Sequence, residues 1–482
     1  MSIPITGLLL IPLGLTIIML PWRFCLIGLM IFAMMSPAAV VNVGRVGLQP
    51  GYYLGLLMIG RTAAEIMVQK FSLNTFAISQ MRSLWWFIAL VFLVLFIALC
   101  FFQGTVDVLP GTYGYKTGNT HPFYFARENL TQIAYLLINF TLLYCLAHGA
   151  ARQKLAKLIS AWDAAIVCGL FFAVAVCVWQ FFSFYAGIPF PTDFFYSNAG
   201  YSRSDSQALV GLLRINGPFE EPSILGYTFT GYMLFSWARY RTHPTTLTIV
   251  MLVASLLCSL LSSSTTALAG IFLFLGLVLY DVATGKVNLV PTRFRLSPAR
   301  FLAIAAVFAI ILVGAFAAAD NWGAIQFILR DVLFDKAGTT SFKQRSFADF
   351  LALQIFTETY GIGVGLGSHK ANSLLLTLLS NTGLIGVVLF GWFLFGILTW
   401  KRSLDESRAD AIRPFQLFLL GLLTMHVISN PNLSVLTFWL LMGSMLGLKT
   451  AEHRQEAGAG VMPDLGLSPQ NRLVGTARKS LA

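Results

Sequence analysis

Charged residues are scarce in this chain, and their scarcity excludes a soluble globular protein. Asp, Glu, Lys and Arg make up 11% of the 482 residues, whereas a soluble domain carries roughly 25%. Hydrophobic residues make up 57%. Many of them form runs of about 20, the length at which an α-helix crosses a bilayer. The alternating segments of about ten residues that are typical of a membrane β-barrel are missing. The sequence therefore predicts an all-α, polytopic integral membrane protein.

The features of several other protein classes are also missing. All six cysteines fall in apolar runs, without metal-ligand spacing or paired loop positions, so we interpret them as buried hydrophobic residues. No Ser-His-Asp set, metal cluster or redox motif is visible. The first apolar run has no basic n-region and no small-residue cleavage site, which favours a retained span over a signal peptide. The net charge of +12 lies mostly in short loops and the C-terminal tail, which argues against nucleic acid as a partner.

Apolar runs predict a helical bundle of twelve or thirteen spans within one membrane domain, residues 1–449. The third span is the weakest, because Arg61 and Glu65 interrupt it. The predicted spans are approximately 3–20, 24–41, 48–66, 84–102, 130–148, 163–186, 223–238, 246–262, 265–283, 301–319, 372–399, 414–429 and 433–449.

Lys and Arg concentrate in alternate loops and so predict the orientation of the bundle. The basic loops from residue 149 onward, together with the C-terminal tail, are expected on the cytoplasmic side. The orientation of the N-terminus depends on the third span and stays open. We expect residues 450–482 to form a disordered cytoplasmic tail. The long loops then lie outside, and their length and aromatic content are typical of functional loops: 103–129, 187–222 and 320–371.

The first candidate site is the segment Arg214-Ile-Asn-Gly-Pro-Phe-Glu-Glu-Pro-Ser223, directly before a predicted span. Its Gly-Pro pair predicts a turn, and Pro222 suits the first turn of the helix that follows. Arg214, Glu220 and Glu221 would then lie at the outer mouth of the bundle. Glu221 has a structural alternative, since a carboxylate stabilises the positive end of a helix dipole. A cation such as Arg214 gains nothing there.

The second candidate site is Lys343-Gln-Arg345, at the start of an amphipathic stretch. The spacing of Phe342, Phe347, Phe350, Leu351, Ile355 and Phe356 predicts a helix lying in the membrane interface. Arginine suits a diphosphate, because its planar guanidinium donates two parallel charge-assisted hydrogen bonds. The alternative is an interfacial arginine that only extends its charge into water.

The third candidate site is the glycine-rich turn Gly361-Ile-Gly-Val-Gly-Leu-Gly-Ser-His-Lys-Ala-Asn-Ser373, which leads into a predicted span. Free backbone N–H groups at such a turn favour phosphate, although the spacing is not that of a Walker loop or a dinucleotide fingerprint. His369 is a candidate base and Lys370 a candidate cation. Ser368 and Asn372 are candidate substrate contacts. The alternative for Asn372 or Ser373 is a purely structural role as the helix N-cap.

In this order, these motifs resemble the O-antigen polymerase and ligase superfamily, the Wzy- and WaaL-like bacterial glycosyltransferases of the GT-C type. The resemblance covers roughly residues 200–390. It rests on Arg214, Gly217 and Phe219 before a mid-chain span, on Arg345 in the late loop, and on the glycine-rich turn leading to Thr382-Gly-Leu-Ile-Gly386.

Two shorter motifs are similar to the exopolysaccharide-polymerase branch of that superfamily. They are Phe-x-Glu-Pro-Ser, at Phe219–Ser223, and Gly-Ser-His-Lys-x-Asn-Ser, which ends at Ser373. One position departs from the pattern. Many members have His-Asn at the head of the late span, where this chain has Asn372-Ser373, and His369 lies three residues earlier.

The resemblance implies a GT-C-like, metal-independent glycosyltransferase of the bacterial inner membrane, without a cofactor and with long periplasmic loops. It would transfer a glycan from undecaprenyl diphosphate to a lipid-linked repeat unit in exopolysaccharide or O-antigen biosynthesis. Its partners would be undecaprenyl-diphosphate-linked oligosaccharides, the bilayer, and other polysaccharide assembly and export proteins.

In such a reaction, the candidate site residues would have two roles, which are stabilisation of the leaving group's charge and transfer of a proton. The cations that would bind the diphosphate are Arg214, Arg345, Lys370 and Lys343. The groups that would take the proton of the acceptor hydroxyl are Glu221, Glu220 or His369. One alternative is a ligase that attaches finished polymer to lipid A core. Another, from a different class, is a lipid-linked oligosaccharide flippase or transporter, which the nearly charge-free span centres disfavour.

Overall fold

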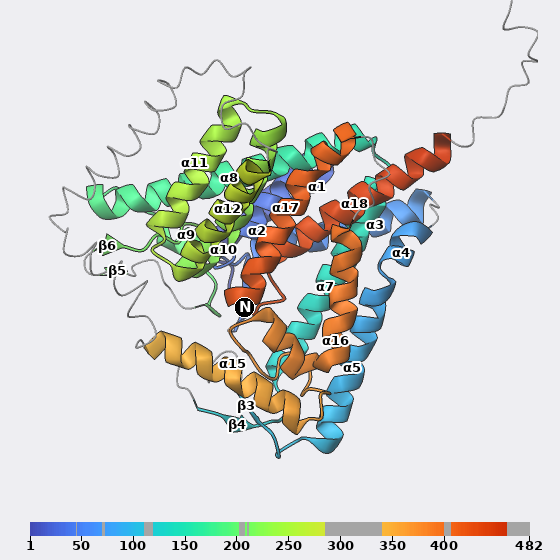
Figure 1. Cartoon of the computed structure of the whole chain (residues 1–482), viewed down its shortest axis with the longest axis vertical. Helices are drawn as coiled ribbons and strands as arrows, with labels where there is room; N and C mark the ends of the chain where they lie inside the picture. Colours follow the sequence, from blue (N-terminus) through green and yellow to red (C-terminus); the bar gives the residue numbers. More distant parts are fainter. Residues whose placement is uncertain are drawn as a thin grey trace, which may run out of the picture.

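The computed structural model describes residues 1–44, 46–69, 73–109, 119–201, 208–209, 212–284, 340–399 and 406–459. Within these residues the chain is almost entirely helical (Figure 1). Its helices are α1 (Ile5–Met19), α2 (Trp22–Met34), α3 (Pro50–Gln69), α4 (Thr75–Gln80), α5 (Arg82–Phe101), α7 (Arg127–Ala150), α8 (Leu155–Ala186), α9 (Thr192–Phe195), α10 (Pro222–Thr242), α11 (Thr246–Leu261), α12 (Thr265–Ala283), α15 (Thr340–Glu358), α16 (Leu374–Leu398), α17 (Glu406–Ser429) and α18 (Leu436–Ala459).

The described residues also include three short antiparallel ladders, each of two strands. They join β1 (Val41–Val43) to β2 (Val46–Leu48), β3 (Asp107–Val108) to β4 (His121–Pro122), and β5 (Ala208–Leu209) to β6 (Leu212–Leu213).

Several helices have the length and composition that a bilayer requires. Six of those described are long and apolar enough to cross a membrane: α5, α7, α8, α12, α16 and the part of α17 that begins at Arg408. Helices α1, α2 and α11 are shorter and apolar. The prediction of an all-α, multi-pass membrane protein is therefore confirmed.

The predicted spans correspond closely to helices. Each predicted span overlaps a helix, except 301–319, which lies outside the described residues. The prediction 24–41 was too long, because α2 ends at Met34. Helix α18 continues to Ala459 and so enters the segment in which we expected a disordered tail. The expected loop 320–371 contains the helix α15 in its described part, as predicted. Of the apolar residues predicted to share one face, Leu351 and Ile355 are buried, whereas Phe342, Phe347 and Phe350 are exposed.

Hydrogen bonds between loops divide the helix ends into two groups. At the first, which we call the site end, they join Leu109 to His369, Asn372 to Ile428, and Ile215 to Leu261. At the second, the opposite end, contacts join Arg454 to Ala151, Lys449 to Gly396, and Arg239 to Asp163. The grouping follows the alternation of loops predicted from Lys and Arg.

Helix α3 shows how the N-terminal helices are oriented. Arg61 forms an ion pair with Glu65, with 2.9 Å between Nε and Oε1. It also donates to the carbonyl groups of Ile18 and Leu20, where α1 ends. The two charges that interrupt this apolar run therefore lie at the opposite end. Ser2 pairs with residue 42, so the N-terminus lies at the site end.

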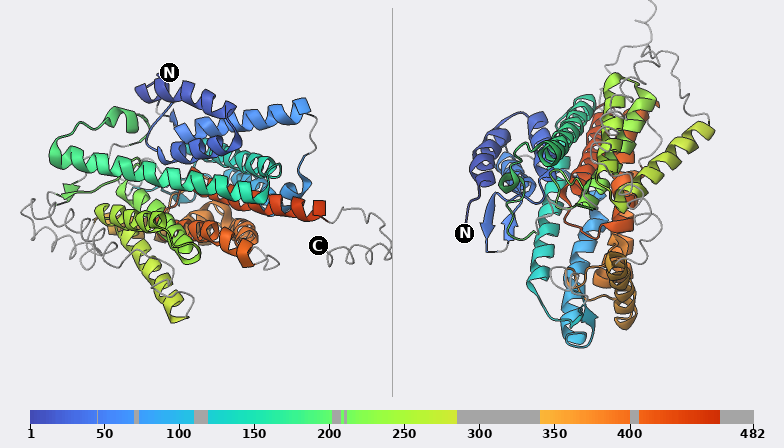
Figure 2. Two further views of the ribbon diagram at one scale, coloured as in Figure 1. Left: turned by 90° about the horizontal axis from the view of Figure 1, so that it is seen from above. Right: turned by 90° about the vertical axis from the view of Figure 1, so that its left-hand side faces the viewer.

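Helices α8 and α10 flank the first candidate segment, which ends in the first turn of α10. Helix α10 is buried over most of its length and packs against α11, α12 and α17. Helix α8 has 32 residues, which corresponds to about 48 Å and exceeds the ~30 Å hydrocarbon core of a bilayer. In the left view of Figure 2, α8 runs along the molecule beside α18, which it contacts.

Candidate functional site

The turn that precedes α10 is fixed to α8 by a buried glutamine. Gln180 Oε1 accepts hydrogen bonds from the N–H groups of Asn216 and Gly217, at 3.1 and 2.8 Å. Gln180 Nε2 donates to Asn216 Oδ1 at 2.7 Å. Asn216 Nδ2 donates to the Phe219 carbonyl, and the Tyr196 hydroxyl donates to the Gly217 carbonyl. These bonds satisfy the polar groups of a buried turn and hold it in one conformation.

Only glycine fits at the centre of this turn. Gly217 has φ +57°, and a Cβ atom there would lie 2.5 Å from Cys177 Sγ. The side chain of Phe219 is buried beside it. The turn therefore fixes Arg214 on one side and Glu220 on the other.

Arg214 and Arg345 lie near enough at the site end for the charge of one to act on the other, although they are 131 positions apart in sequence. Burial lowers the pKa of Arg214, the charge of Glu221 opposes that change, and the charge of Arg345 lowers the pKa further. Arg214 Nε is buried and has no hydrogen-bond partner among the described residues. A buried guanidinium N–H without an acceptor is unusual, and an anionic ligand would satisfy it.

Glu220 has the acidity of a group that exchanges protons at neutral pH. Burial raises its pKa to about 7, the adjacent charge of Glu221 raises it as well, and Lys370 lowers it. The two carboxyl groups differ in position. Glu220 is partly buried, whereas Glu221 is exposed and accepts a hydrogen bond from Ser223 Oγ at 3.2 Å. Glu221 occupies the N-cap position of α10 without a capping hydrogen bond from its side chain.

Asp349 belongs to the same group of charges and joins α15 to the start of α16. Its Oδ1 accepts a hydrogen bond from the Asn372 N–H at 2.8 Å. Burial raises the pKa of Asp349, while the N–H groups of Asn372 and Ser373 and the charge of Arg345 lower it. Arg345 lies one helical turn before Asp349, so both face the bundle from α15.

Helix α15 separates the two candidate cations of the second site. Figure 1 shows α15 crossing the site end beside the β3–β4 hairpin, which it contacts. Its buried face consists of Ala348, Leu351, Ala352 and Ile355. Arg345 is partly buried, whereas Lys343 is exposed. Two residues correspond to about 200° around a helix, so Lys343 lies on the far side of α15 from Arg345.

The N–H groups of the glycine-rich turn pair with carbonyl groups at a kink in α16. The expectation that they bind phosphate is therefore not supported. Helix α16 is kinked at Gly383, where φ is +68° and ψ is −173°. The carbonyl groups of Ser380 and Asn381, freed by the kink, accept from the N–H groups of Val364 and Gly365, both at 2.9 Å. The turn therefore satisfies backbone groups that would otherwise be unpaired inside the bundle.

Three glycines of the turn are required by their backbone angles and their close contacts. Gly363, Gly365 and Gly367 all have φ near +90°. A Cβ atom on Gly365 would lie 2.6 Å from Leu95 Cδ1 of α5. The turn is thus packed into the bundle, and most of its N–H groups are engaged within the protein.

His369 has a structural environment that does not suit a base. Its Nδ1 accepts from the Leu109 N–H at 3.2 Å, and its Nε2–H points to the Ala348 carbonyl at 3.1 Å. Burial lowers the pKa of His369 to about 4. Both ring nitrogens are engaged and the ring is neutral at pH 7, so we leave His369 out of the catalytic set.

The two candidate substrate contacts are also held by the protein. Ser368 is buried, and its Oγ donates to the Val364 carbonyl and accepts from Asn129 Nδ2, both at 2.8 Å. Asn372 Nδ2 donates to the Ile428 carbonyl at 3.2 Å. Asn372 is partly exposed beside Asp349, so it remains a candidate for contact with substrate, whereas Ser368 has a structural position.

Sequence reasoning missed several residues that build this site. Asp349 was detectable from its i, i+4 spacing to Arg345. Gln180 and Asn381 are polar residues inside apolar runs, a signal of a buried hydrogen-bond network. Asn381 Oδ1 accepts from the N–H groups of Ser368 and His369.

The assembled site contains three cations and three carboxyl groups at one end of a membrane bundle. The cations are Arg214, Arg345 and Lys370; the carboxyl groups are Glu220, Glu221 and Asp349. Among the described residues, no three His, Cys, Asp or Glu side chains are grouped to hold a metal ion. No protein-family model matches the chain, and no curated protein matches it.

Proposed function

We propose that this protein is a polysaccharide polymerase of the bacterial inner membrane. It transfers a growing glycan from undecaprenyl diphosphate to a lipid-linked repeat unit on the periplasmic side. The observation that carries the proposal is that the charge of Arg345 acts on Arg214 and the charge of Lys370 acts on Glu220 at one end of the bundle, with Glu221 acting on both Arg214 and Glu220. The order of the sequence motifs, which resembles that of the polymerase and ligase superfamily, supports it.

The cations stabilise the leaving group of this reaction. As the acceptor oxygen bonds to the anomeric carbon, the bond from that carbon to the diphosphate oxygen breaks and the diphosphate gains negative charge. A rigid turn and α15 hold the backbone at Arg214 and Arg345, so their guanidinium groups lie near that charge before the reaction begins. A GT-C-like arrangement with periplasmic loops follows from the proposal.

Glu220 accepts the proton that the acceptor hydroxyl loses. A base is most effective when its pKa lies near the working pH, and the pKa of Glu220 is raised to about 7. Lys370 acts on the same carboxyl group and keeps a fraction of it ionised. Glu221 is exposed and instead contributes charge beside Arg214.

Arginine variants test the proposal in a strain that lacks the chromosomal copy. Arg214→Gln and Arg345→Gln should each reduce long-chain polymer by about 100-fold or more, because each removes a cation from the developing charge. Lys343→Gln is the matched control, since this cation lies on the exposed side of α15, and it should leave chain length unchanged. Normal chain length in both arginine variants, at wild-type membrane levels, would contradict the proposal.

The lipid-linked glycans of the deletion strain distinguish polymerase from ligase. A strain without its polymerase accumulates single repeat units on the lipid carrier. A strain without its ligase accumulates full-length polymer on it. We expect single repeat units, and the arginine variants should reproduce that pattern.

A further inference from the structure

A large cavity lies at the opposite end of the bundle, away from the candidate site. Its volume is about 710 Å³, within the range of ~300–1,000 Å³ that is usual for small-ligand sites. It is formed where the α1–α2 turn, the second half of α3 and the α7–α8 connection meet. No residue of the proposed glycosyl-transfer site lines it.

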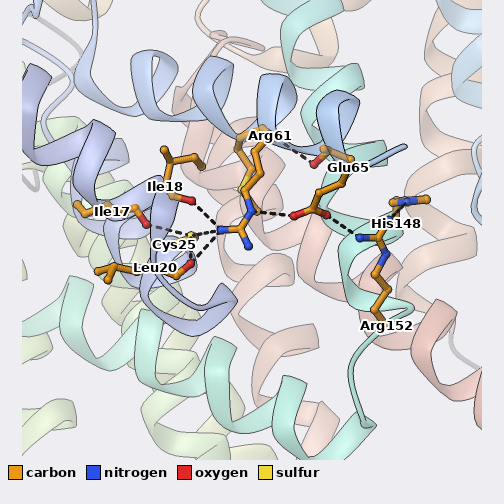
Figure 3. A network of polar contacts seen from close by, with 10 residues as sticks. Ile17, Ile18, Leu20, Cys25, Arg61, Glu65, His148 and Arg152 are labelled. Atoms are coloured by element: carbon orange, nitrogen blue, oxygen red, sulfur yellow. Dashed lines mark hydrogen bonds and ion pairs between the residues drawn. The ribbon is translucent and has the colours of Figure 1, made fainter. Parts of the chain in front are cut away.

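The charges that line this cavity are mostly positive. Four cations, Arg23, Arg61, Arg152 and Lys157, face one carboxylate, Glu65. Glu65 forms ion pairs with both Arg61 and Arg152, at 2.9 and 2.6 Å (Figure 3). One carboxylate shared by two guanidinium groups leaves an excess of positive charge at the cavity wall.

The two guanidinium groups of this network are held in fixed positions. Arg61 Nη1 donates to the carbonyl groups of Ile18 and Leu20, at 2.7 and 2.9 Å. Figure 3 shows Arg152 lying between Glu65 and His148, with 2.7 Å between Arg152 Nη2 and His148 Nε2. Fixed donors bind an anion with less loss of side-chain freedom than mobile ones.

The remaining two cations are available for a ligand. Arg23 and Lys157 are exposed, and neither has a hydrogen bond or ion pair to a described residue. The apolar residues beside them face outward, since Met19 is 84% and Phe24 50% exposed. A cavity lined by cations, with exposed apolar side chains close by in the chain, matches a phosphate head group attached to acyl chains.

We propose that this cavity binds the phosphate group of an anionic ligand at the opposite end of the bundle. The exposed Met19 and Phe24, which lie close in the chain to lining residues, fit an anionic phospholipid of the inner leaflet, while a free phosphate shares the same chemistry inside the cavity. The ion-paired Arg61, Glu65 and Arg152 form the floor of the site. Arg23 and Lys157 supply the charge that the ligand neutralises.

Binding to the purified full-length chain in neutral detergent tests the proposal. Native mass spectrometry measures retention of phosphatidylglycerol against phosphatidylcholine, and thermal unfolding measures the effect of inorganic phosphate against chloride at equal ionic strength. Wild type should retain phosphatidylglycerol preferentially. Protection by inorganic phosphate would identify the phosphate group alone as sufficient, whereas retention of phosphatidylglycerol without protection by inorganic phosphate would identify the lipid head group.

Paired variants separate this site from general attraction between charges. The double variant Arg23→Gln, Lys157→Gln should bind phosphatidylglycerol about tenfold or more weakly, since it loses two charge-assisted contacts. The control Arg82→Gln, Lys154→Gln removes two exposed cations that do not line the cavity, and it should bind like wild type. Equal binding by wild type and the cavity variant, or an equal loss in the control, would overturn the proposal. Lys157→Gln alone serves if the double variant does not elute as a single species.

Discussion

At the scale of single residues, the sharpest contrast in the site is between two adjacent carboxyl groups. Glu220 is partly buried with a pKa raised to about 7, and Glu221 is exposed at the N-cap of α10. Two neighbouring carboxyl groups in different surroundings can take different roles. The sequence names both as candidate bases, because adjacency along the chain does not indicate which one the fold buries.

Substitution of each carboxyl group separates the two roles. Glu220→Gln should reduce polymer synthesis by about 100-fold or more, since the amide cannot accept a proton. Glu221→Gln is the matched control, with the same chemical change one residue away, and should retain most of the activity. Both are measured as polymer formed per unit of membrane protein. Equal losses in the two variants would assign the function to their shared charge rather than to Glu220.

The pKa of Glu220 also predicts a pH dependence. A raised carboxyl pKa means that the proton is held until the pH passes about 7, so the ionised, proton-accepting form increases with pH. In proteoliposomes, kcat/KM should therefore rise about tenfold between roughly pH 6 and pH 8, since this ratio reports the free enzyme. A flat profile in wild type, or an unchanged rise in the Glu220→Gln variant, would show that another group titrates.

At the scale of elements, the site depends on the seating of the glycine-rich turn in the kink of α16. The Leu384 N–H, freed by the kink, donates to the Gly361 carbonyl at 3.2 Å. A Cβ atom on Gly383 would overlap that same carbonyl oxygen. The turn therefore fixes the position of Lys370 and of the Asn372–Asp349 contact, which follow it in the chain.

An alanine in this turn should destabilise the protein. In Gly365→Ala the added Cβ would lie 2.6 Å from Leu95 Cδ1, and φ would stay at +91°, a region that costs non-glycine residues about 1–3 kcal/mol. We expect a lower midpoint of thermal unfolding for the detergent-purified chain. Gly391→Ala is the control, because its Cβ would meet nothing within 4 Å, and it should match wild type or exceed it. Equal midpoints for the two variants would argue against a tightly seated turn.

The helices were predictable for a physical reason that does not extend to the turn. Inside a bilayer, an apolar run of about 20 residues satisfies its backbone hydrogen bonds by forming a helix. The spans could therefore be placed from the positions of the apolar runs alone. The turn Gly361–Gly367 was recognised, but its free N–H groups have two possible acceptors, a ligand or another backbone. Only the distant kink at Gly383 decides between them, and nothing in the local pattern connects the two segments. In the same way, the proximity of Arg345 to Arg214 depends on how α15 crosses the bundle, which the local sequence does not indicate.

At the scale of the whole molecule, the helical bundle separates two polar ends that differ in their balance of positive and negative charges. The site end contains cations and carboxyl groups together, and the opposite end contains a cavity with an excess of cations. Positive charge at the opposite end agrees with the predicted cytoplasmic side. Because Ser2 pairs with Asn42 at the site end and Lys449 of α18 contacts Gly396 at the opposite end, the two polar ends assign a side to every described loop.

Cysteine labelling tests this sidedness directly. In a Cys100→Ser background, Tyr124→Cys and Phe342→Cys lie at exposed positions of the site end, and Lys154→Cys lies exposed at the opposite end. A membrane-impermeant maleimide applied to spheroplasts should label the first two, and should label Lys154→Cys only after lysis. The unsubstituted background measures labelling of the remaining cysteines. Labelling of Lys154→Cys in intact spheroplasts with protection of Tyr124→Cys would place Arg214 and Glu220 in the cytosol, on the wrong side for a glycan carried to the periplasm. Labelling of Tyr124→Cys without Phe342→Cys would instead separate α15 from the site end and remove Arg345 from the proposed reaction.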